Sequence, residues 1–275
     1  MHHSHRRQAI LSPATAVLIL GEKGPKPLPV LPIRDSIPAS RFPIVNGLLI
    51  AANILVFLYE LSLPPEALEP FVRRWAAIPA MFNPASDFLG SPVAGVPRLI
   101  TSMFLHGSLL HVGFNMLFLW VFGDNVEDRI GHVPYLIFYL ACGIAAAATQ
   151  IFFSLESEVP IVGASGAIGG VLGAYMIAFP HARVLTFFWF FIFLRFIWIP
   201  ALFYLGLWFV MQLFQAVGST ATMTSAQGGV AFWAHVGGFV AGAALILVIR
   251  KKPPLRRLRL REGDYPLYPT RRTWR

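Results

Sequence analysis

The sequence predicts an all-α, polytopic membrane protein in which six transmembrane helices pack as one bundle. Three observations lead to this fold class. The 275 residues are 56% hydrophobic and 13% charged, whereas soluble domains carry roughly 25% charged residues. Apolar stretches of membrane-spanning length recur along the chain, separated by turn residues or charge. The basic residues gather at the two ends, on either side of the apolar block.

The predicted spans follow from the ~20 residues that an α-helix needs to cross the hydrocarbon of a bilayer. They lie at roughly 44–63, 108–127, 133–153, 165–179, 198–216 and 229–249. The fourth is short, because a helix from Ser165 to Phe179 rises only ~21 Å. His181 and Arg183 hold its far end at the level of the headgroups. The end at Ser165 is therefore expected to be recessed below the opposite surface.

The charges divide the chain into a basic, largely irregular arm (1–41), a membrane domain (42–250) and a basic tail (251–275). Of the 22 Lys and Arg residues, ten lie from Arg250 onward and six lie before residue 42. An even number of spans puts both termini on one side, and the positive-inside rule makes that side cytoplasmic. The basic surplus predicts contact with an anionic lipid bilayer and not with nucleic acid.

Two segments outside the spans need a separate interpretation. Residues 184–197 are apolar, but Arg195 interrupts them and Pro200 follows. We interpret them as an interfacial or buried connection, with a longer, kinked fifth helix as the alternative. Residues 64–105 are too long for a simple turn, and we expect them to pack as a substructure on the outer leaflet.

Polar side chains inside apolar spans are costly, which makes each of them a candidate for function. Asn46, Asn53 and Glu60 are spaced by seven and so share one face of the first span. For these three, helix packing and interhelical hydrogen bonds are favoured over chemistry. His111 and Asn115 lie four apart and project from one face of the second span. Both side chains can donate hydrogen bonds to one point. This arrangement fits an anion-binding site and a structural role equally well.

Two stripes of small residues predict a close contact between the fourth and sixth spans. Ser165, Gly169 and Gly173 recur every four residues, and His235 shares a face with Gly238 and Gly242. Such stripes bring helix backbones together, and here they would bring the Ser165 hydroxyl near the His235 imidazole. A serine that only caps its helix is the structural alternative.

The expected depths of these groups agree. His235 lies roughly 9 Å inside the outer end of its span, close to the depth of the recessed Ser165. A neutral imidazole is the usual base for a serine nucleophile. Donors for an oxyanion would be the backbone N–H of Ser165 and the side chains of Asn115 and His111. No carboxylate of the sixth span could orient His235, which predicts a dyad instead of a triad.

The motifs around these residues resemble those of the rhomboid family of intramembrane serine proteases. The marks are G-A-S-G at 163–166, H-V-G-F-N at 111–115 and A-H-x-G-G-F-x-x-G at 234–242. They stand in the family's order, and the resemblance covers about 40 to 250. It implies a six-helix rhomboid-like bundle of the bacterial type, in an inner membrane, with its site opening toward the outer side.

The resemblance also implies roles for single residues. Ser165 would be the nucleophile, His235 the general base and acid, and His111 and Asn115 part of the oxyanion hole. No cofactor is implied, and the substrates would be membrane proteins cut in or near their transmembrane segments. The chain departs from the family at two places: Pro97 stands where a tryptophan commonly precedes the arginine matched by Arg98, and Gly169 stands where some members stack a tyrosine beneath the histidine.

Three other classes of function are less consistent with the sequence. A metal protease would need His106, His111 and His235 to approach one another without any H-E-x-x-H motif, and Cys142 is too solitary for a cysteine-based site. A transporter would show internal repeats. A rhomboid-like protein that binds transmembrane clients without cutting them is the strongest alternative. The presence of both the serine and the histidine favours the enzyme over this alternative. The sequence leaves the oligomeric state open.

Overall fold

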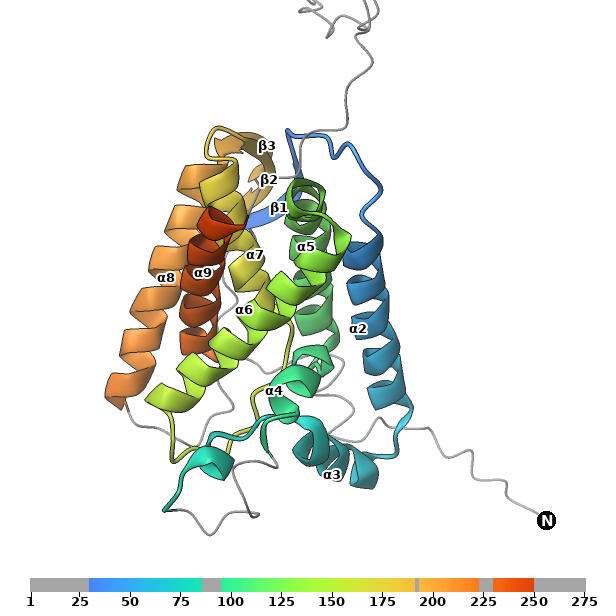
Figure 1. Cartoon of the computed structure of the whole chain (residues 1–275), viewed down its shortest axis with the longest axis vertical. Coiled ribbons are helices and arrows are strands. Elements are labelled where there is room, and N and C mark those ends of the chain that lie inside the picture. Colours follow the sequence, from blue (N-terminus) through green and yellow to red (C-terminus); the bar gives the residue numbers. More distant parts are fainter. Residues whose placement is uncertain (1–29, 86–94, 191–192, 223–229, 250–275) are drawn as a thin grey trace, which may run out of the picture.

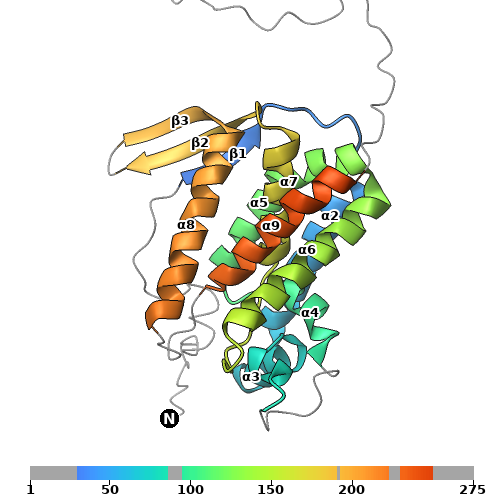
Figure 2. The same cartoon turned by 60° about the vertical axis from the view of Figure 1, so that its left-hand side comes forward.

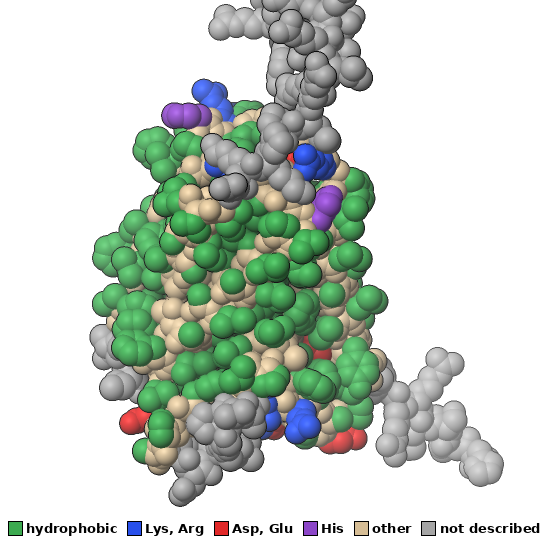
Figure 3. Space-filling view, in the orientation of Figure 1, with side chains coloured by type: hydrophobic (Ala, Val, Ile, Leu, Met, Phe, Trp, Pro, Cys, Tyr) green, Lys and Arg blue, Asp and Glu red, His purple; other side chains and the backbone are tan. Residues whose placement is uncertain are grey.

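The computed structural model describes residues 30–85, 95–190, 193–222 and 230–249, and these form a helical bundle with a small sheet at one end (Figure 1). Most of the predicted arm (1–29) and the predicted tail lie outside the described residues. The mostly helical membrane fold is confirmed. Hydrophobic side chains cover the middle of the face seen in Figure 3, while charged side chains lie toward its two ends.

Each predicted span contains one apolar helix. The helices are α2 (Ile44–Ser62), α5 (Leu109–Ile130), α6 (His132–Phe153), α7 (Ser165–Ala178), α8 (Ala201–Thr222) and α9 (Phe232–Val248). Four of them, α2, α5, α6 and α8, are long and apolar enough to cross a membrane, whereas α7 and α9 are shorter. The 14-residue α7 matches the short fourth span that its sequence predicts.

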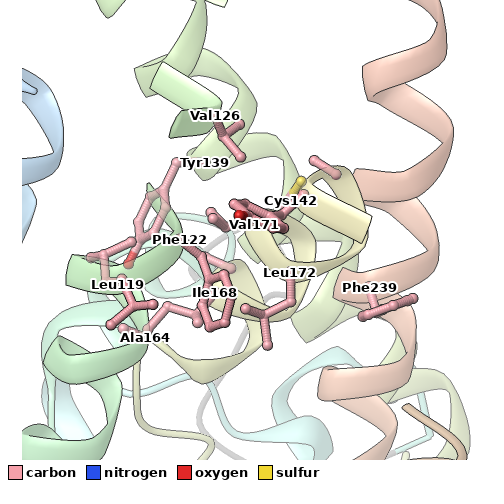
Figure 4. Packing of buried hydrophobic residues seen from close by; sticks show 14 of the residues in the cluster. Leu119, Phe122, Val126, Tyr139, Cys142, Ala164, Ile168, Val171, Leu172 and Phe239 are labelled. Carbon is pink, nitrogen blue, oxygen red and sulfur yellow. The ribbon is translucent and has the colours of Figure 1, made fainter. Parts of the chain in front are cut away.

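The short helix α7 lies inside the bundle, in contact with α5, α6, α8 and α9 (Figure 2). All residues from Gly166 to Tyr175 are buried, so no face of this stretch meets lipid. The core around it is drawn in Figure 4, where Phe122, Cys142 and Leu172 come from three different helices. Because α7 is surrounded, the position of its first residue, Ser165, is set by packing on several sides.

For residues 184–197, the alternative of a longer, kinked fifth helix was wrong, while the interfacial or buried connection stays a prediction. These residues belong to an antiparallel hairpin of β2 (Arg183–Phe190) and β3 (Phe193–Pro200), and α8 begins only at Ala201. The segment is rich in aromatic and β-branched residues, which favour strands. Its length and apolar character left a helix as the alternative, because a short apolar run does not distinguish a strand from a helix.

The predicted irregular arm also contains a strand in its described part. The strand β1 (Val30–Asp35) pairs antiparallel with β2, which gives a three-stranded sheet in the order β1-β2-β3. The register pairs Val30 with Phe188 and Asp35 with Val184, with an irregularity between Pro32 and Arg34. A pairing across about 150 residues leaves no local mark in a sequence, because each strand's partner lies far along the chain.

The segment between α2 and α5 packs at the opposite end of the bundle from the sheet (Figure 1). It contains α3 (Pro65–Trp75), the short helices η1 (Pro79–Phe82) and η3 (Ser102–Phe104), and α4 (Arg98–Thr101). Arg98 donates to the carbonyl oxygen of Arg73 at 3.1 Å, which ties α4 to α3. Residues 86–94 lie outside the described residues.

The polar face of the first span faces other parts of the protein, as its sequence predicts. Asn46, Asn53 and Glu60 are all buried. Asn46 donates to the carbonyl oxygen of Leu119 at 3.0 Å and accepts a bond from the hydroxyl of Tyr135 at 2.9 Å. Glu60 accepts from the backbone N–H of His106 at 3.1 Å. These bonds join α2 to α5, α6 and the loop before α5, which is a packing role.

Candidate active site

Ser165 is the first residue of α7, and its hydroxyl meets the imidazole of His235 from α9. The distance from Ser165 Oγ to His235 Nε2 is 2.8 Å. His235 is buried, with 8% of its surface exposed, while Ser165 is half-buried. The N-cap of α7 is Ala164 and not Ser165, so Ser165 does not serve as the cap of its helix.

The backbones of α7 and α9 touch, and this brings the two side chains together. A Cβ atom on Gly238 would overlap the carbonyl oxygen of Gly166, and one on Gly242 would overlap that of Gly170. A Cβ on Gly173 would overlap the carbonyl oxygen of Phe239. On Gly169 it would lie 3.0 Å from the carbonyl oxygen of His235. The predicted small residues therefore lie at the contact between the two helices.

The other ring nitrogen of His235 has a partner that sequence reasoning missed. Gln212 of α8 places its Oε1 2.6 Å from His235 Nδ1, and the side chain of Gln212 is buried. Trp208, one turn earlier on α8, lies with its ring centroid 5.8 Å from that of the imidazole. The sequence does mark Gln212 as a candidate for function, because it is an amide inside an apolar span. Nothing in the sequence shows which helix that amide faces.

His111 and Asn115 project from α5 toward the turn that precedes Ser165. A Cβ on Gly163 would lie 2.7 Å from His111 Nε2 and 3.6 Å from Asn115 Nδ2. Gly163 has φ +116°, which side chains other than hydrogen rarely allow. Within the described part of the chain, the buried Asn115 Nδ2 has no hydrogen-bond partner. Asn115 Nδ2 is thus an unused donor that faces Gly163, two residues before Ser165 in the chain.

A small recess with a volume of about 20 Å³ opens beside Ser165. Small side chains dominate its walls, which include Gly143, Ala146, Ala147, Gly163, Gly166, Ala231 and Ala234. They come from α6, from the start of α7 and from around the start of α9. The recess gives space next to the hydroxyl for a small side chain or for water.

The third histidine considered for a metal site has a different environment. His106 precedes α5, and its ring centroid lies 5.1 Å from that of His111. Burial, together with the nearby His111, lowers the pKa of His106 to about 3. Its backbone N–H is bound by Glu60. Among the described residues, no group of three or more His, Cys, Asp or Glu side chains could hold a metal ion.

Comparison with known proteins points to one family. The model of the Rhomboid domain matches residues 94–252. The mitochondrial rhomboid protein 1 of Saccharomyces cerevisiae is 29% identical over 139 residues, which is 49% of this chain and 39% of the relative. The rhomboid protease GluP of Bacillus subtilis is 43% identical over 79 residues, 29% of this chain and 15% of the relative.

A human relative, the mitochondrial presenilin-associated rhomboid-like protein, is 34% identical over 146 residues, 51% of this chain and 34% of the relative. The chain thus spans well under half the length of the relatives that it matches. Two of these three proteins carry a mitochondrial name, so the relatives do not select the bacterial membrane that the sequence suggested.

Proposed function

Because the chain belongs to the rhomboid family, we propose that it is an intramembrane serine endopeptidase that cuts membrane proteins in or near their transmembrane segments. The observation that carries this proposal is the 2.8 Å contact between Ser165 Oγ and His235 Nε2. It joins a nucleophile to a base at one end of a buried helix, which is the arrangement that acyl transfer needs.

In the proposed reaction, His235 Nε2 takes the proton of the Ser165 hydroxyl while Oγ attacks the scissile carbonyl carbon. The oxyanion of the tetrahedral intermediate accepts hydrogen bonds from Asn115 Nδ2, from His111 and from the backbone N–H of Ser165. His235 then gives its proton to the leaving amine, and an acyl-enzyme on Ser165 remains. A water molecule, deprotonated by His235, hydrolyses that ester and restores the hydroxyl.

The recess beside Ser165 supports a preference for a small residue before the scissile bond. Its walls are mostly glycine and alanine, so a bulky side chain would have to displace backbone. Charged side chains would be left there without an ionic partner among the lining residues, at a high desolvation cost.

The alternative function is a silent rhomboid-like protein that binds transmembrane clients without cutting them. Both functions predict binding of single-span membrane proteins, and only the enzyme predicts acylation of Ser165. Fluorophosphonate labelling separates them directly. The protease should be labelled as wild type and as Ser62→Ala, an exposed serine at the end of α2, but not as Ser165→Ala.

The decisive experiment uses purified protein in liposomes with a single-span substrate that has a small residue before the cut. Ser165→Ala and His235→Ala should each abolish cleavage while the protein keeps its fold. Cleavage that persists in Ser165→Ala would assign the reaction to another nucleophile. Binding without cleavage or labelling in the wild type would establish the silent alternative.

We further propose that both termini lie on the cytoplasmic side of a bacterial inner membrane and that Ser165 opens toward the other side. Support comes from the six apolar helices of the described residues, an even number, and from Ser165 being the first residue of α7, whose other end leads into the sheet (Figure 1). Reporter fusions after residue 275 and within the 154–163 loop test this orientation. Equal reporter activity at both places would contradict it.

A further inference from the structure

We propose that Gln212 is a positioning residue that fixes the tautomer and the orientation of the His235 imidazole. This inference rests on the proposed function. The sequence predicted a dyad, because the sixth span offers no carboxylate. The partner of His235 comes instead from α8, where Gln212 Oε1 lies 2.6 Å from His235 Nδ1.

The chemistry of the imidazole explains why this partner matters. A neutral imidazole carries one N–H, and the hydrogen bond at one nitrogen decides which of the two has it. An amide oxygen only accepts, so it holds the proton on Nδ1 and leaves the lone pair on Nε2. That lone pair faces Ser165 Oγ at 2.8 Å. The opposite tautomer would present N–H to the hydroxyl and could not take its proton.

The contact of Gln212 with His235 also fits the departure from the family at Gly169, where some members stack a tyrosine beneath the histidine. A side chain at this position would crowd the backbone of α9, because a Cβ atom there would lie 3.0 Å from the carbonyl oxygen of His235. Support for the ring is found on α8. Trp208 and Gln212 are four residues apart, so they share one face of that helix, and both contact His235.

The test compares two glutamines on one helix. Gln212→Leu removes the acceptor at similar size, and Gln215→Leu makes the same change at an exposed position less than one turn away. We expect Gln212→Leu to lower kcat at nearly constant KM by ~10-fold or more, and by no more than the ~10²–10⁴-fold of general base catalysis. Gln215→Leu should match the wild type.

A second variant separates orientation from simple structural support. Gln212→Glu keeps an acceptor and should restore much of the lost kcat. Its carboxylate favours the protonated ring, so the acid limb of the pH profile should move to higher pH. Among the described residues, the titratable side chain whose charge also acts on His235 is His111, which stays unchanged. A profile identical to that of the wild type would contradict the inference.

A direct readout does not depend on activity. Nitrogen NMR of protein labelled in its 8 histidines reports the tautomer of His235, assigned by loss of its signals in His235→Ala. We expect the Nδ1–H form in the wild type and an increased Nε2–H form in Gln212→Leu. If the wild type neither cleaves nor labels, the proposed function fails. If it cleaves but Gln212→Leu changes neither kcat nor tautomer, only this inference fails.

A different observation, at the other end of the bundle, carries a second inference. The outer strand β3 exposes apolar side chains on both faces: Leu194, Phe196 and Trp198 on one and Ile197 on the other, with Phe196 63% exposed. Arg195 lies exposed among them. Figure 2 shows the β2–β3 hairpin reaching sideways beyond α8.

The surroundings of β3 indicate what covers it. The exposed apolar surface continues into the first turn of α8 through Leu202 and Phe203, and α8 is long and apolar enough to cross a membrane. Arg34 of β1 lies over the ring of Trp198, 5.5 Å from its centre. The guanidinium groups need polar partners, and so does the outer backbone edge of β3, which pairs with no strand among the described residues. The apolar side chains avoid water.

Only the boundary between headgroups and acyl chains satisfies both requirements. We infer that the β2–β3 hairpin lies in this boundary and binds anionic phospholipid. Its phosphate oxygens would accept from Arg195 and from the N–H groups on the outer edge of β3. Tryptophan and arginine are common at this depth of the membrane.

The test uses a fluorophore whose emission reports water. It is attached at Phe196→Cys or, as control, at Glu156→Cys in an exposed loop, both with the buried Cys142 replaced by Ala. In phosphatidylcholine vesicles with phosphatidylglycerol, we expect a blue-shifted emission and quenching by headgroup nitroxides at Phe196→Cys only. Arg195→Glu should remove the effect of phosphatidylglycerol. Water-like emission, or cross-linking of two copies through Phe196→Cys, would overturn the inference.

Discussion

The two ends of α7 are held by different kinds of contact. From the Ser165 end as far as Gly173, the helix touches α9 through bare backbone, with glycine on one or both sides. At the other end, the hydroxyl of Tyr175 bonds to the carboxylate of Asp35 in β1, and its ring packs on Phe122 with centroids 5.0 Å apart. Backbone contacts cannot adjust, whereas side chains can change rotamer. We infer that the first end sets reactive geometry and the second sets stability.

The largest effect is expected from an added methyl group at the Ser165 end. Gly238→Ala would place a carbon on the carbonyl oxygen of Gly166 and force the helices apart. We expect cleavage to be lost and the free energy of unfolding to fall by about 1–3 kcal/mol. Gly206→Ala on α8 is the control, because no atom lies within 4 Å of the new carbon. Full activity of Gly238→Ala would contradict the inference that this end of α7 sets the reactive geometry.

The next largest effect is expected at Asn115, whose Nδ2 is an unused donor near the Ser165 end of α7. Asn115→Ala should lower kcat by ~10²-fold to ~10³-fold with little change of KM, because its bond forms as the oxyanion develops. Steady-state kinetics in liposomes measure both constants. A raised KM at unchanged kcat would instead give Asn115 a role in substrate binding.

A smaller effect is expected at the far end. Tyr175→Phe removes the hydroxyl that donates to Asp35 and should lower the free energy of unfolding by about 1 kcal/mol. Cleavage should stay close to that of the wild type. Thermal unfolding in detergent measures the change, and Tyr59→Phe, at an exposed tyrosine, is the matched control. A strong loss of activity without loss of stability would show that the two ends are coupled.

The smallest effect concerns pH. Burial raises the pKa of Asp35 above its usual value, although bonds from Tyr175 and the backbone oppose the shift. A raised pKa means that this group's stabilising contribution is present at low pH and is lost as pH rises through the raised value. Asp35→Asn keeps an acceptor without charge. Its melting temperature relative to the wild type should therefore increase as the pH rises above the usual pKa of an aspartate. A decrease would contradict this sign.

The sequence was sufficient to predict the parts that depend on local pattern. Span length predicted the six apolar helices, and the short rise from Ser165 predicted that α7 would be shorter than the others that cross the membrane. The strands were missed because β1 and β2 pair across about 150 residues, and an apolar run fits either structure. Gln212 was missed because its partner depends on how α8 is rotated, which the packing of whole helices decides.

The position of Ser165 as the first residue of α7 also gives its hydroxyl a fixed rotational phase. Each residue of an α-helix turns by about 100° and advances by about 1.5 Å. One alanine inserted between Ser165 and the buried glycines that follow would swing the nucleophile away from α9 while preserving every side chain of the site. The arrangement is therefore encoded in a residue count as much as in residue identities, and deletions within α7 should be tolerated even less than substitutions.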